Sequence, residues 1–304
     1  MADDGASGGK PVPHTDVAII GAGFAGLGMA IKLRQANRDD FVVLERSEGL
    51  GGTWRDNSYP GCACDVPSQL YSFSFAPNPD WSHAYSGQAE IRRYMERCAE
   101  DFAIRPFLRF GQRVVALDWD EARALWHITT ADGARRTARV VVAGTGPLNK
   151  PAWPDLPGLD RFAGPVFHSA RWDHGVDLRA KRVAVIGTGA SAIQFVPEIA
   201  RRVAHLDVYQ RTPPWIIPRL DYRVPAWMRG LYRRLPVAQK LHRGFIYWSL
   251  EWRAIGFTRM PGLLRAFQWG AERFLRAQVA DPDLRARLTP DYRLGCKRVL
   301  LSDD

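Results

Sequence analysis

The sequence has few of the features that mark a secreted, disulfide-bonded or membrane-spanning protein. Only four of its 304 residues are cysteines. Cys62 and Cys64 are separated by a single residue, which is the spacing of neither a zinc ribbon nor a redox dithiol, so we expect reduced, structural thiols and no metal site. No run of about 18 apolar residues is present, so stable membrane insertion is not expected. Residues 1–15 lack the charged and apolar regions of a signal peptide, which predicts a flexible tail on a cytoplasmic protein.

Acidic residues are scarce in the last third of the chain. The net charge is +10, and the stretch from Arg219 to Arg298 alone holds 17 Lys/Arg against 6 Asp/Glu. A basic block of this kind is compatible with nucleic acid, an anionic membrane surface, an anionic cofactor or solvated helix faces. Solvated helix faces in an Arg-rich protein are the simplest interpretation, and no nucleic-acid partner is predicted.

The order strand, glycine-rich turn, helix, strand and carboxylate is found in residues 16–46. An apolar run at Val17–Ile20 precedes the glycine motif GAGFAG at 21–26, and an apolar-periodic helix and a second apolar run at Phe41–Leu44 follow. Glu45 stands 19 residues after the last glycine. Glycines at this spacing let a pyrophosphate approach the helix N-terminus, and the carboxylate accepts hydrogen bonds from ribose hydroxyls. Together these features predict a site for FAD or NAD.

The same plan returns in residues 181–212. The run Val183–Ile186 leads into GTGASA at 187–192, and a helix and the run Leu206–Tyr209 follow. An arginine, Arg211, occupies the position that a carboxylate has in the first unit. A carboxylate repels a ribose 2′-phosphate, whereas a guanidinium pairs with it, so the second unit predicts NADP. The alternative for Arg211 is a surface charge at a strand end.

Two dinucleotide sites in one chain indicate electron transfer between two cofactors, most often from NADPH to a flavin. The run Val140–Ala143 followed by Gly-Thr-Gly predicts a strand that returns to the first sheet, and Trp119 and Trp126 lie in a β-meander before it. The predicted fold class is α/β, with two Rossmann-like dinucleotide-binding domains and a helical insertion. Helical spacing runs from Pro225 to about residue 280, and the aromatic residues of this segment are expected to form core rather than a substrate pocket.

The segment FAGPVFHSARWD at 162–173 resembles a known family fingerprint. It matches the Phe-x-Gly-x-x-x-His-x-x-x-Trp-Pro/Asp pattern of Baeyer–Villiger-type monooxygenases, which are class B flavin-dependent enzymes. The matching residues are Phe162, Gly164, His168, Trp172 and Asp173. Related enzymes that oxygenate amines and sulfides usually have Tyr or Phe in place of this Trp. We expect Phe162 and Trp172 to anchor the segment in neighbouring domains, and His168 to set the interdomain geometry.

Two further segments carry the resemblance, namely Gly51–Asp65 and the Gly-Cys-Lys-Arg run at 295–298. The resemblance assigns Arg298 and Asp65 as catalytic residues, with Asp65 holding the arginine beside the flavin. The implied FAD contacts are Gly21, Gly23, Phe24, Gly26, Glu45, Arg46, Gly52, Thr53, Trp54, Asp65, Tyr71 and Val114. The implied NADP contacts are Gly187, Thr188, Gly189, Ala190, Ser191, Ala192, Gln194, Arg211, Thr212, Lys297 and Arg298.

The reaction that the resemblance implies needs FAD, NADPH and dioxygen. NADPH reduces FAD, the reduced flavin adds dioxygen to form a C4a-peroxyflavin, and this species converts a ketone into an ester or lactone. A guanidinium at Arg298 would supply fixed positive charge for the oxygen anions, since it stays protonated.

The implied domain order follows the family with one departure. The expected segments are a flexible tail (1–15), the first part of an FAD-binding domain (16–146), an interdomain linker with the fingerprint (147–180), an NADP-binding domain (181–218), a helical insertion (219–293) and a truncated return to the NADP-binding domain (294–304). Members of the family usually continue well beyond this point, so the comparison predicts a C-terminally truncated product.

Three alternatives remain. One is an enzyme with the same cofactors that oxygenates amines or sulfides. Another is a pyridine-nucleotide disulfide reductase, although Cys62 and Cys64 have the wrong spacing for its dithiol. The third is a non-catalytic fragment that binds nucleotide or nothing.

Overall fold

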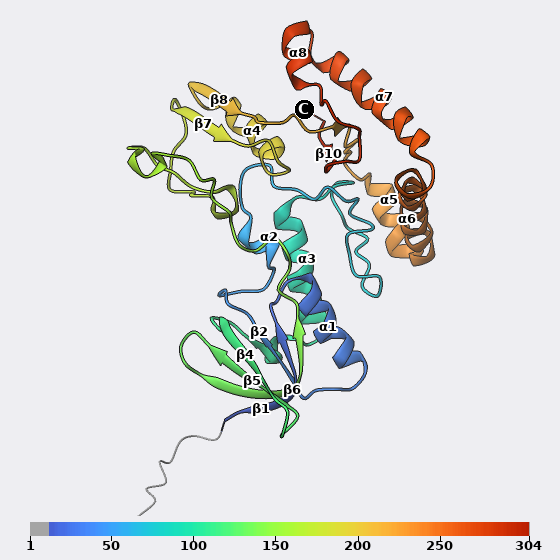
Figure 1. Cartoon of the computed structure of the whole chain (residues 1–304). Helices are drawn as coiled ribbons and strands as arrows, with labels where there is room; N and C mark the ends of the chain where they lie inside the picture. Colours follow the sequence, from blue (N-terminus) through green and yellow to red (C-terminus); the bar gives the residue numbers. More distant parts are fainter. Residues whose placement is uncertain (1–11, 304) are drawn as a thin grey trace, which may run out of the picture. The chain divides into compact units, whose positions relative to one another are not determined.

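The computed structural model describes residues 12–303 and divides the chain into two compact units (Figure 1). The first unit comprises the chain up to Asp56 together with Arg92–Lys150, and the second comprises Asn57–Ile91 together with the chain from Pro151 onward. Side chains 253–255, 257, 258, 261 and 263 lie outside the description. Of the expected tail, residues 1–11 lie outside the described residues, and His14 and Thr15 already belong to the first strand.

The first unit contains a six-stranded sheet with the order β3-β2-β1-β6-β5-β4. Its strands are β1 (His14–Ile20), β2 (Phe41–Leu44), β3 (Leu108–Arg109), β4 (Val114–Asp120), β5 (Leu125–Thr130) and β6 (Arg135–Ala143). β1 is parallel to β2 and to β6, whereas β4, β5 and β6 form an antiparallel meander. The strand–turn–helix–strand unit, the meander and the returning strand are therefore present as the sequence predicts.

Apolar runs form the centre of this sheet because parallel strands are covered on both faces. All four residues of β2 are buried, and Ala18, Leu44 and Ile128 lie in one core cluster. Helix α1 (Phe24–Gln35) buries Leu27 and Ile31. The unit also contains α2 (Thr53–Asp56), most of α3 (Gln88–Asp101) and the 3-10 turn Arg105–Phe107.

The second unit holds two small parallel pairs, β7 with β8 and β9 with β10. The strands are β7 (Arg182–Ile186), β8 (His205–Tyr209), β9 (Ile216–Ile217) and β10 (Leu300–Leu301), and the helices are α4 (Ala192–Ala200), α5 (Ala226–Arg234), α6 (Pro236–Thr258), α7 (Pro261–Gln278) and α8 (Pro282–Leu288). Short 3-10 turns span Leu159–Arg161 and Ser169–Arg171. Within residues 12–303, no helix has the length and apolar character that crossing a membrane requires.

Helix α6 carries polar side chains on its inward face. Gln239 is 3% exposed, and its amide donates to Gln69 Oε1 and to Asn78 O, both at 2.7 Å. Arg243 donates to the carbonyls of Gln69 and Leu70 at 2.7 and 3.0 Å. These bonds satisfy the carbonyls of a loop that has no strand partner, and they fix residues 69–78 to the insertion.

The expectation that the aromatic residues of the insertion form core is only partly right. Phe267 packs against the buried cluster around Trp215 and Ala271. Phe245 and Trp248, however, are 71% and 69% exposed, because the inward face of α6 is taken by the polar contacts with loop 69–78.

Residues 57–91 also differ from the expected domain boundaries. They stand inside the span 16–146 that the sequence assigns to one domain, yet they belong to the second unit. The reason lies in their hydrogen bonds, which go to Gln194, to Asp221 and Tyr222, and to α6. The backbone groups of a loop form hydrogen bonds with whichever partners are near in space, and local sequence does not identify those partners.

The first glycine turn gives a stability prediction. A Cβ on Gly26 would stand 1.8 Å from the carbonyl oxygen of Gly21, and both atoms belong to the packed junction of α1 and β1. We expect Gly26→Ala to lower the free energy of unfolding by about 3 kcal/mol, as overpacking of a tight site does. Urea unfolding followed by circular dichroism measures this. Gly230→Ala in α5 is the control, because no atom lies within 4 Å of its Cβ, and an equal loss there would contradict the steric explanation.

Candidate functional site

The first glycine turn lies at the carboxyl end of β1 and has an uncapped helix N-terminus. Gly21 has φ +100°, and a Cβ on it would stand 2.8 Å from Gly144 O. Gly23 is the N-cap of α1 and provides no side-chain hydrogen bond to the N–H groups of the first turn. Gly52 is close by, since its Cβ would lie 3.0 Å from the Cα of Gly23. The turn can therefore accept a phosphate, and only small residues approach it.

The carboxylate of Glu45 is fixed at the end of β2. It is 6% exposed, and its two oxygens accept the N–H groups of Ala22 at 2.7 Å and Ser47 at 2.9 Å. The sequence assigned it to a ribose, and the structure places it against the glycine turn. Because a carboxylate offers about four acceptor sites, two remain for hydroxyl donors.

Two aromatic residues predicted at the first site are packed within the first unit. Phe24 begins α1 and stacks on Tyr94 with ring centroids 6.3 Å apart. Trp54, which follows Gly52 and Thr53 in α2, is 7% exposed. These positions border the glycine turn. The ring of Trp54 is already buried by protein, whereas Phe24 is half-buried.

Arg46 and Val114 complete the first-unit predictions. The Arg46 guanidinium pairs with Asp56 Oδ2 at 3.2 Å and donates to Asn149 O at 3.2 Å. Val114 begins β4 beside a register shift and packs on the cluster that contains Leu44. The structure thus gives both residues protein partners.

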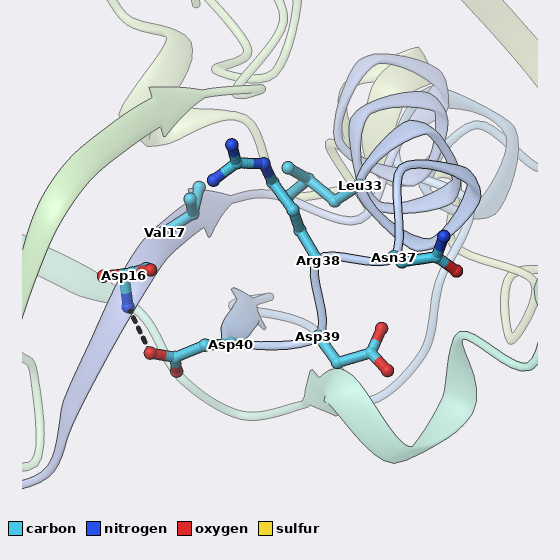
Figure 2. A pocket seen from close by; sticks show the side chains of 7 residues that line it. All are labelled: Asp16, Val17, Leu33, Asn37, Arg38, Asp39 and Asp40. Atoms are coloured by element: carbon cyan, nitrogen blue, oxygen red, sulfur yellow. Dashed lines mark hydrogen bonds between the residues drawn. The ribbon is translucent and has the colours of Figure 1, made fainter.

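A surface pocket of the first unit lies near the amino ends of β1 and β2, away from the glycine turn. Figure 2 shows its carboxylates, Asp16, Asp39 and Asp40, with the Asp16 N–H donating to Asp40 Oδ2 at 3.1 Å. Ligands of open parallel sheets bind at the carboxyl ends of the strands, so this pocket is at the wrong end for a nucleotide.

The second glycine turn, at the carboxyl end of β7, is open. Gly187 has φ +100°, and no atom lies within 4 Å of a Cβ built on Gly187 or Gly189. Ser191, the N-cap of α4, makes no side-chain cap, and Thr188, Ala190 and Ala192 complete the turn. The free space and the uncapped amides suit a phosphate group.

The basic residues predicted at the second turn are exposed. Arg211 follows β8, whose last residue, Tyr209, accepts the N–H of Gly187 at 2.9 Å, and the half-buried Thr212 comes next. Lys297 lies with its ammonium 4.5 Å from the ring centroid of Tyr292. Arg211 thus stands at the same strand pair as the glycine turn.

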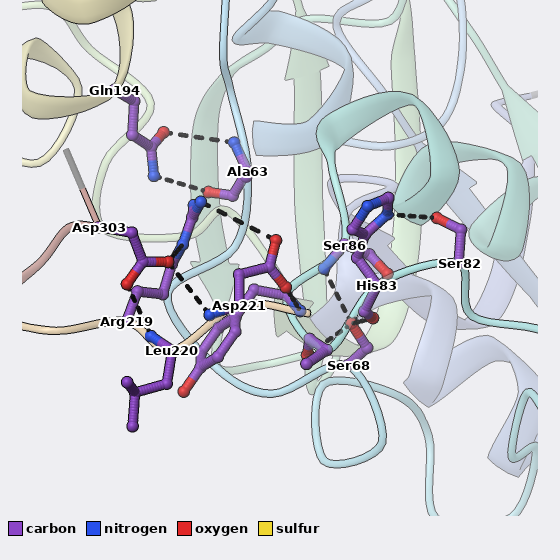
Figure 3. Close-up of polar contacts among 12 residues, drawn as sticks. Ala63, Ser68, Ser82, His83, Ser86, Gln194, Arg219, Leu220, Asp221 and Asp303 are labelled. Atoms are coloured by element: carbon purple, nitrogen blue, oxygen red, sulfur yellow. Dashed lines mark hydrogen bonds and ion pairs between the residues drawn. The ribbon is translucent and has the colours of Figure 1, made fainter. Parts of the chain in front are cut away.

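Gln194 holds the loop that carries Asp65. Figure 3 shows its amide paired with both backbone groups of Ala63: Nε2 donates to the carbonyl at 3.0 Å, and Oε1 accepts the N–H at 3.3 Å. The Tyr59 hydroxyl also donates to Oε1 at 3.0 Å, and burial raises the pKa of this phenol, which keeps it protonated. The sequence assigned Gln194 to NADP, whereas the structure shows its amide occupied by the chain. Nothing in the sequence links positions 131 residues apart.

Asp65 and Arg298, which are 233 positions apart in the sequence, meet in the second unit. The Arg298 guanidinium donates to Asp65 Oδ2. The Arg298 side chain is 59% exposed and the Asp65 side chain is 40% exposed. The pair that the family resemblance implied is therefore present. Tyr71 lies half-buried in the same unit, six residues beyond Asp65.

The fingerprint segment belongs to the second unit, and its aromatic residues make contacts there. Phe162 is 61% exposed and lies over Gly164, where a Cβ would meet the ring at 2.6 Å. Trp172 packs against Phe195 of α4, with ring centroids 5.2 Å apart. The glycine in the motif therefore makes room for the phenyl ring.

The polar residues of the fingerprint make local bonds. His168 Nδ1 accepts the N–H of Ala170 at 3.0 Å, which caps the 3-10 turn Ser169–Arg171. Asp173 Oδ1 accepts the N–H of Gly175 at 2.8 Å. Both bonds fix the backbone on the approach to β7.

The four cysteines are free thiols. Burial raises the pKa of Cys62 to about 11 and that of Cys64 to about 12, so both are protonated at neutral pH. Thiols in this state are weak nucleophiles, which argues against dithiol chemistry. Among the described residues, no cluster of His, Cys, Asp or Glu could hold a metal ion.

Comparison with known proteins gives a consistent family. The model of flavin-binding monooxygenase-like proteins matches residues 14–252. The chain is 55% identical over 289 residues to a Baeyer–Villiger monooxygenase of Streptomyces coelicolor (95% of this chain, 56% of that protein) and 52% identical over 297 residues to one of Pseudomonas aeruginosa (96% and 56%). The chain therefore spans about half the length of these curated relatives.

Solved structures share the fold. An oxidized steroid monooxygenase bound to NADP superposes with a TM-score of 0.81 at 33% identity (95% of this chain, 62% of that one). The OTEMO complex with FAD and NADP gives 0.82 at 29% identity (96% and 63%). The α/β class with two Rossmann-like domains and a helical insertion is thus confirmed.

The contacts of Gln194 give a second prediction. Gln194→Leu keeps most of the side-chain volume but leaves the N–H and carbonyl of Ala63 without partners, so we expect the free energy of unfolding to fall by about 1–3 kcal/mol. Thermal and urea unfolding measure the loss. Gln35→Leu is the control, since that exposed residue only accepts from Lys32, and a comparable loss there would contradict the assignment.

Proposed function

Because the chain belongs to the family of flavin-binding monooxygenase-like proteins, we propose that the protein is an FAD- and NADPH-dependent Baeyer–Villiger monooxygenase. It would convert a ketone into an ester or lactone with dioxygen. The observation that carries the proposal is the contact between Arg298 and Asp65 in the unit that also contains the open glycine turn.

The first glycine turn is the proposed FAD site. The uncapped N-terminus of α1 would receive the pyrophosphate, and Glu45 would accept bonds from the ribose. When bound, FAD accepts a hydride and activates dioxygen, which no side chain of the chain can do. The buried position of Glu45 supports this assignment, because its carboxylate is already directed at the turn.

The second glycine turn is the proposed NADP site. The space above Gly187 and Gly189 supports phosphate binding, and Arg211 and Lys297 supply positive charge for the 2′-phosphate. Both cations are exposed and can reorient toward a ligand.

Arg298 is the proposed catalytic residue, and Asp65 orients it. A guanidinium holds its charge at every relevant pH, so it can stabilise negative charge on oxygen during oxygen insertion without a proton-transfer step. One Nη of the Arg298 guanidinium is bonded to Asp65. The remaining N–H donors stay available because the Arg298 side chain is 59% exposed.

Removal of the guanidinium should separate the two halves of the reaction. We expect the protein to bind FAD and oxidise NADPH with ketone turnover, and Arg298→Ala to lower ester formation by about 10²–10³-fold while flavin reduction stays measurable. Product analysis and anaerobic flavin absorbance measure the two steps. Arg293→Ala on the same segment is the control. Undiminished ester formation in Arg298→Ala would contradict the role, and turnover of sulfides but not ketones would contradict the substrate class.

Arg211 should set the preference for NADPH over NADH. Arg211→Ala removes the cation that the 2′-phosphate would pair with, so we expect about tenfold weaker NADPH binding and unchanged NADH binding. Steady-state KM values for the two reductants measure this. Arg182→Ala, at the opposite end of β7, is the matched control. Equal losses for both reductants would show that Arg211 does not read the 2′-phosphate.

A further inference from the structure

The carboxylate of Asp303 lies in a cup of backbone N–H groups. Its two oxygens accept the N–H groups of Leu220 at 2.8 Å and Asp221 at 3.1 Å, and Arg219 Nε lies 3.6 Å away (Figure 3). Leu220 adopts φ +57°, a left-handed conformation that turns the two successive N–H groups to the same side. A leucine rarely adopts this conformation, so we attribute its stability here to the hydrogen bonds with the Asp303 carboxylate.

Asp303 keeps its negative charge in this cup. Burial acts to raise the pKa of the carboxyl, but the N–H donors of Asp221 and Leu220 and the charge of Arg219 outweigh it, and the pKa is lowered. The carboxylate is therefore ionised at neutral pH and binds the cup in its strongest form.

From the cup, a chain of bonds leads to Asp65. Asp221 Oδ1 accepts the N–H of Tyr85 at 3.0 Å. The next residue, Ser86, accepts the N–H of Cys64 through its carbonyl at 3.0 Å. Cys64 directly precedes Asp65, so the backbone that carries the catalytic carboxylate is two hydrogen bonds away from Asp221.

In the other direction, Asp303 is tied to Arg298 through β10. Leu300 and Leu301 pair with β9, and the N–H of Ser302 donates to Ile217 O at 3.1 Å. Arg298 stands two residues before this strand. The bonds thus form a closed ring whose last link is the Arg298–Asp65 pair.

That last link does not hold itself in place. Both side chains are more than a third exposed, and ion pairs in water contribute little to their own geometry. We propose that Asp303 and Asp221 are positioning residues, which fix the backbones of Arg298 and Asp65 so that the guanidinium and the carboxylate face each other. The proposal rests on the proposed function only for its effect on turnover.

The test that does not depend on cofactors is hydrogen exchange of single amides. We expect Asp303→Ala to raise the exchange rates of the Leu220, Asp221, Tyr85 and Cys64 amides by at least tenfold. Asp177→Ala is the matched control, because Asp177 is an exposed carboxylate paired with Arg179 and outside the ring. A change confined to Leu220 and Asp221 overturns the proposal. If Asp303→Ala does not fold, Asp221→Ala is used instead, because it removes the acceptor of the Tyr85 N–H. Faster exchange at the Tyr85 and Cys64 amides then supports the proposal, and unchanged exchange overturns it.

A double-mutant cycle with Arg298→Ala tests the effect on turnover. Asp303→Ala should lower kcat for ester formation about tenfold in the wild-type background and have no further effect once Arg298 is absent. Leu220→Gly keeps both N–H groups of the cup and should leave kcat unchanged. If Asp303→Ala lowers kcat by the same factor with and without Arg298, its role is purely structural and the proposal is overturned. Absence of ketone turnover in the wild type would refute the proposed function alone, because the exchange experiment still decides the positioning role.

Discussion

The pairing of Gln194 with Ala63 is the contact on which the candidate site depends. The chain leaves the first unit after Asp56. Without hydrogen bonds to the second unit, the loop that follows would not be fixed there. An amide side chain that donates to a carbonyl and accepts from an N–H mimics one rung of a sheet, so it satisfies the backbone without requiring a strand. Because Gln194 projects from the helix that follows the second glycine turn, Asp65 shares a unit with that turn.

Polar contacts with backbone organise the rest of the second unit in the same manner. Gln239 and Arg243 donate hydrogen bonds to carbonyls of loop 69–78. The carboxylates of Asp221 and Asp303 accept hydrogen bonds from backbone N–H groups. Irregular segments leave many backbone groups unpaired, and each one that is buried without a partner is costly. These four side chains supply such partners, which is why polar residues face inward where apolar ones would be expected.

Local patterns in the sequence predict the parts of the fold whose cause is local. The apolar runs of β1, β2, β7 and β8 stand where expected because a covered parallel strand needs continuous apolar residues, and the glycine turns follow them because of backbone conformation at Gly21 and Gly187. The assignment of residues 57–91 to the second unit could not be predicted, since the hydrogen bonds to Gln194 and Asp221 span 131 and 136 positions and a loop has no periodicity. The pair Arg298–Asp65 was found only through resemblance, and the cup around Asp303 had no signal at all.

The two predicted ribose contacts differ in how far they are organised before any ligand arrives. Glu45 is buried and held by two backbone N–H groups, so the position of its carboxylate is already fixed. Arg211 is exposed at a strand end, and ordering its long side chain costs conformational entropy upon binding. A preorganised site favours tight, lasting occupancy, whereas a site that must be ordered favours exchange. If the first turn holds FAD and the second NADP, this contrast matches the chemistry, because a flavin stays through many turnovers and the reductant must be replaced in each.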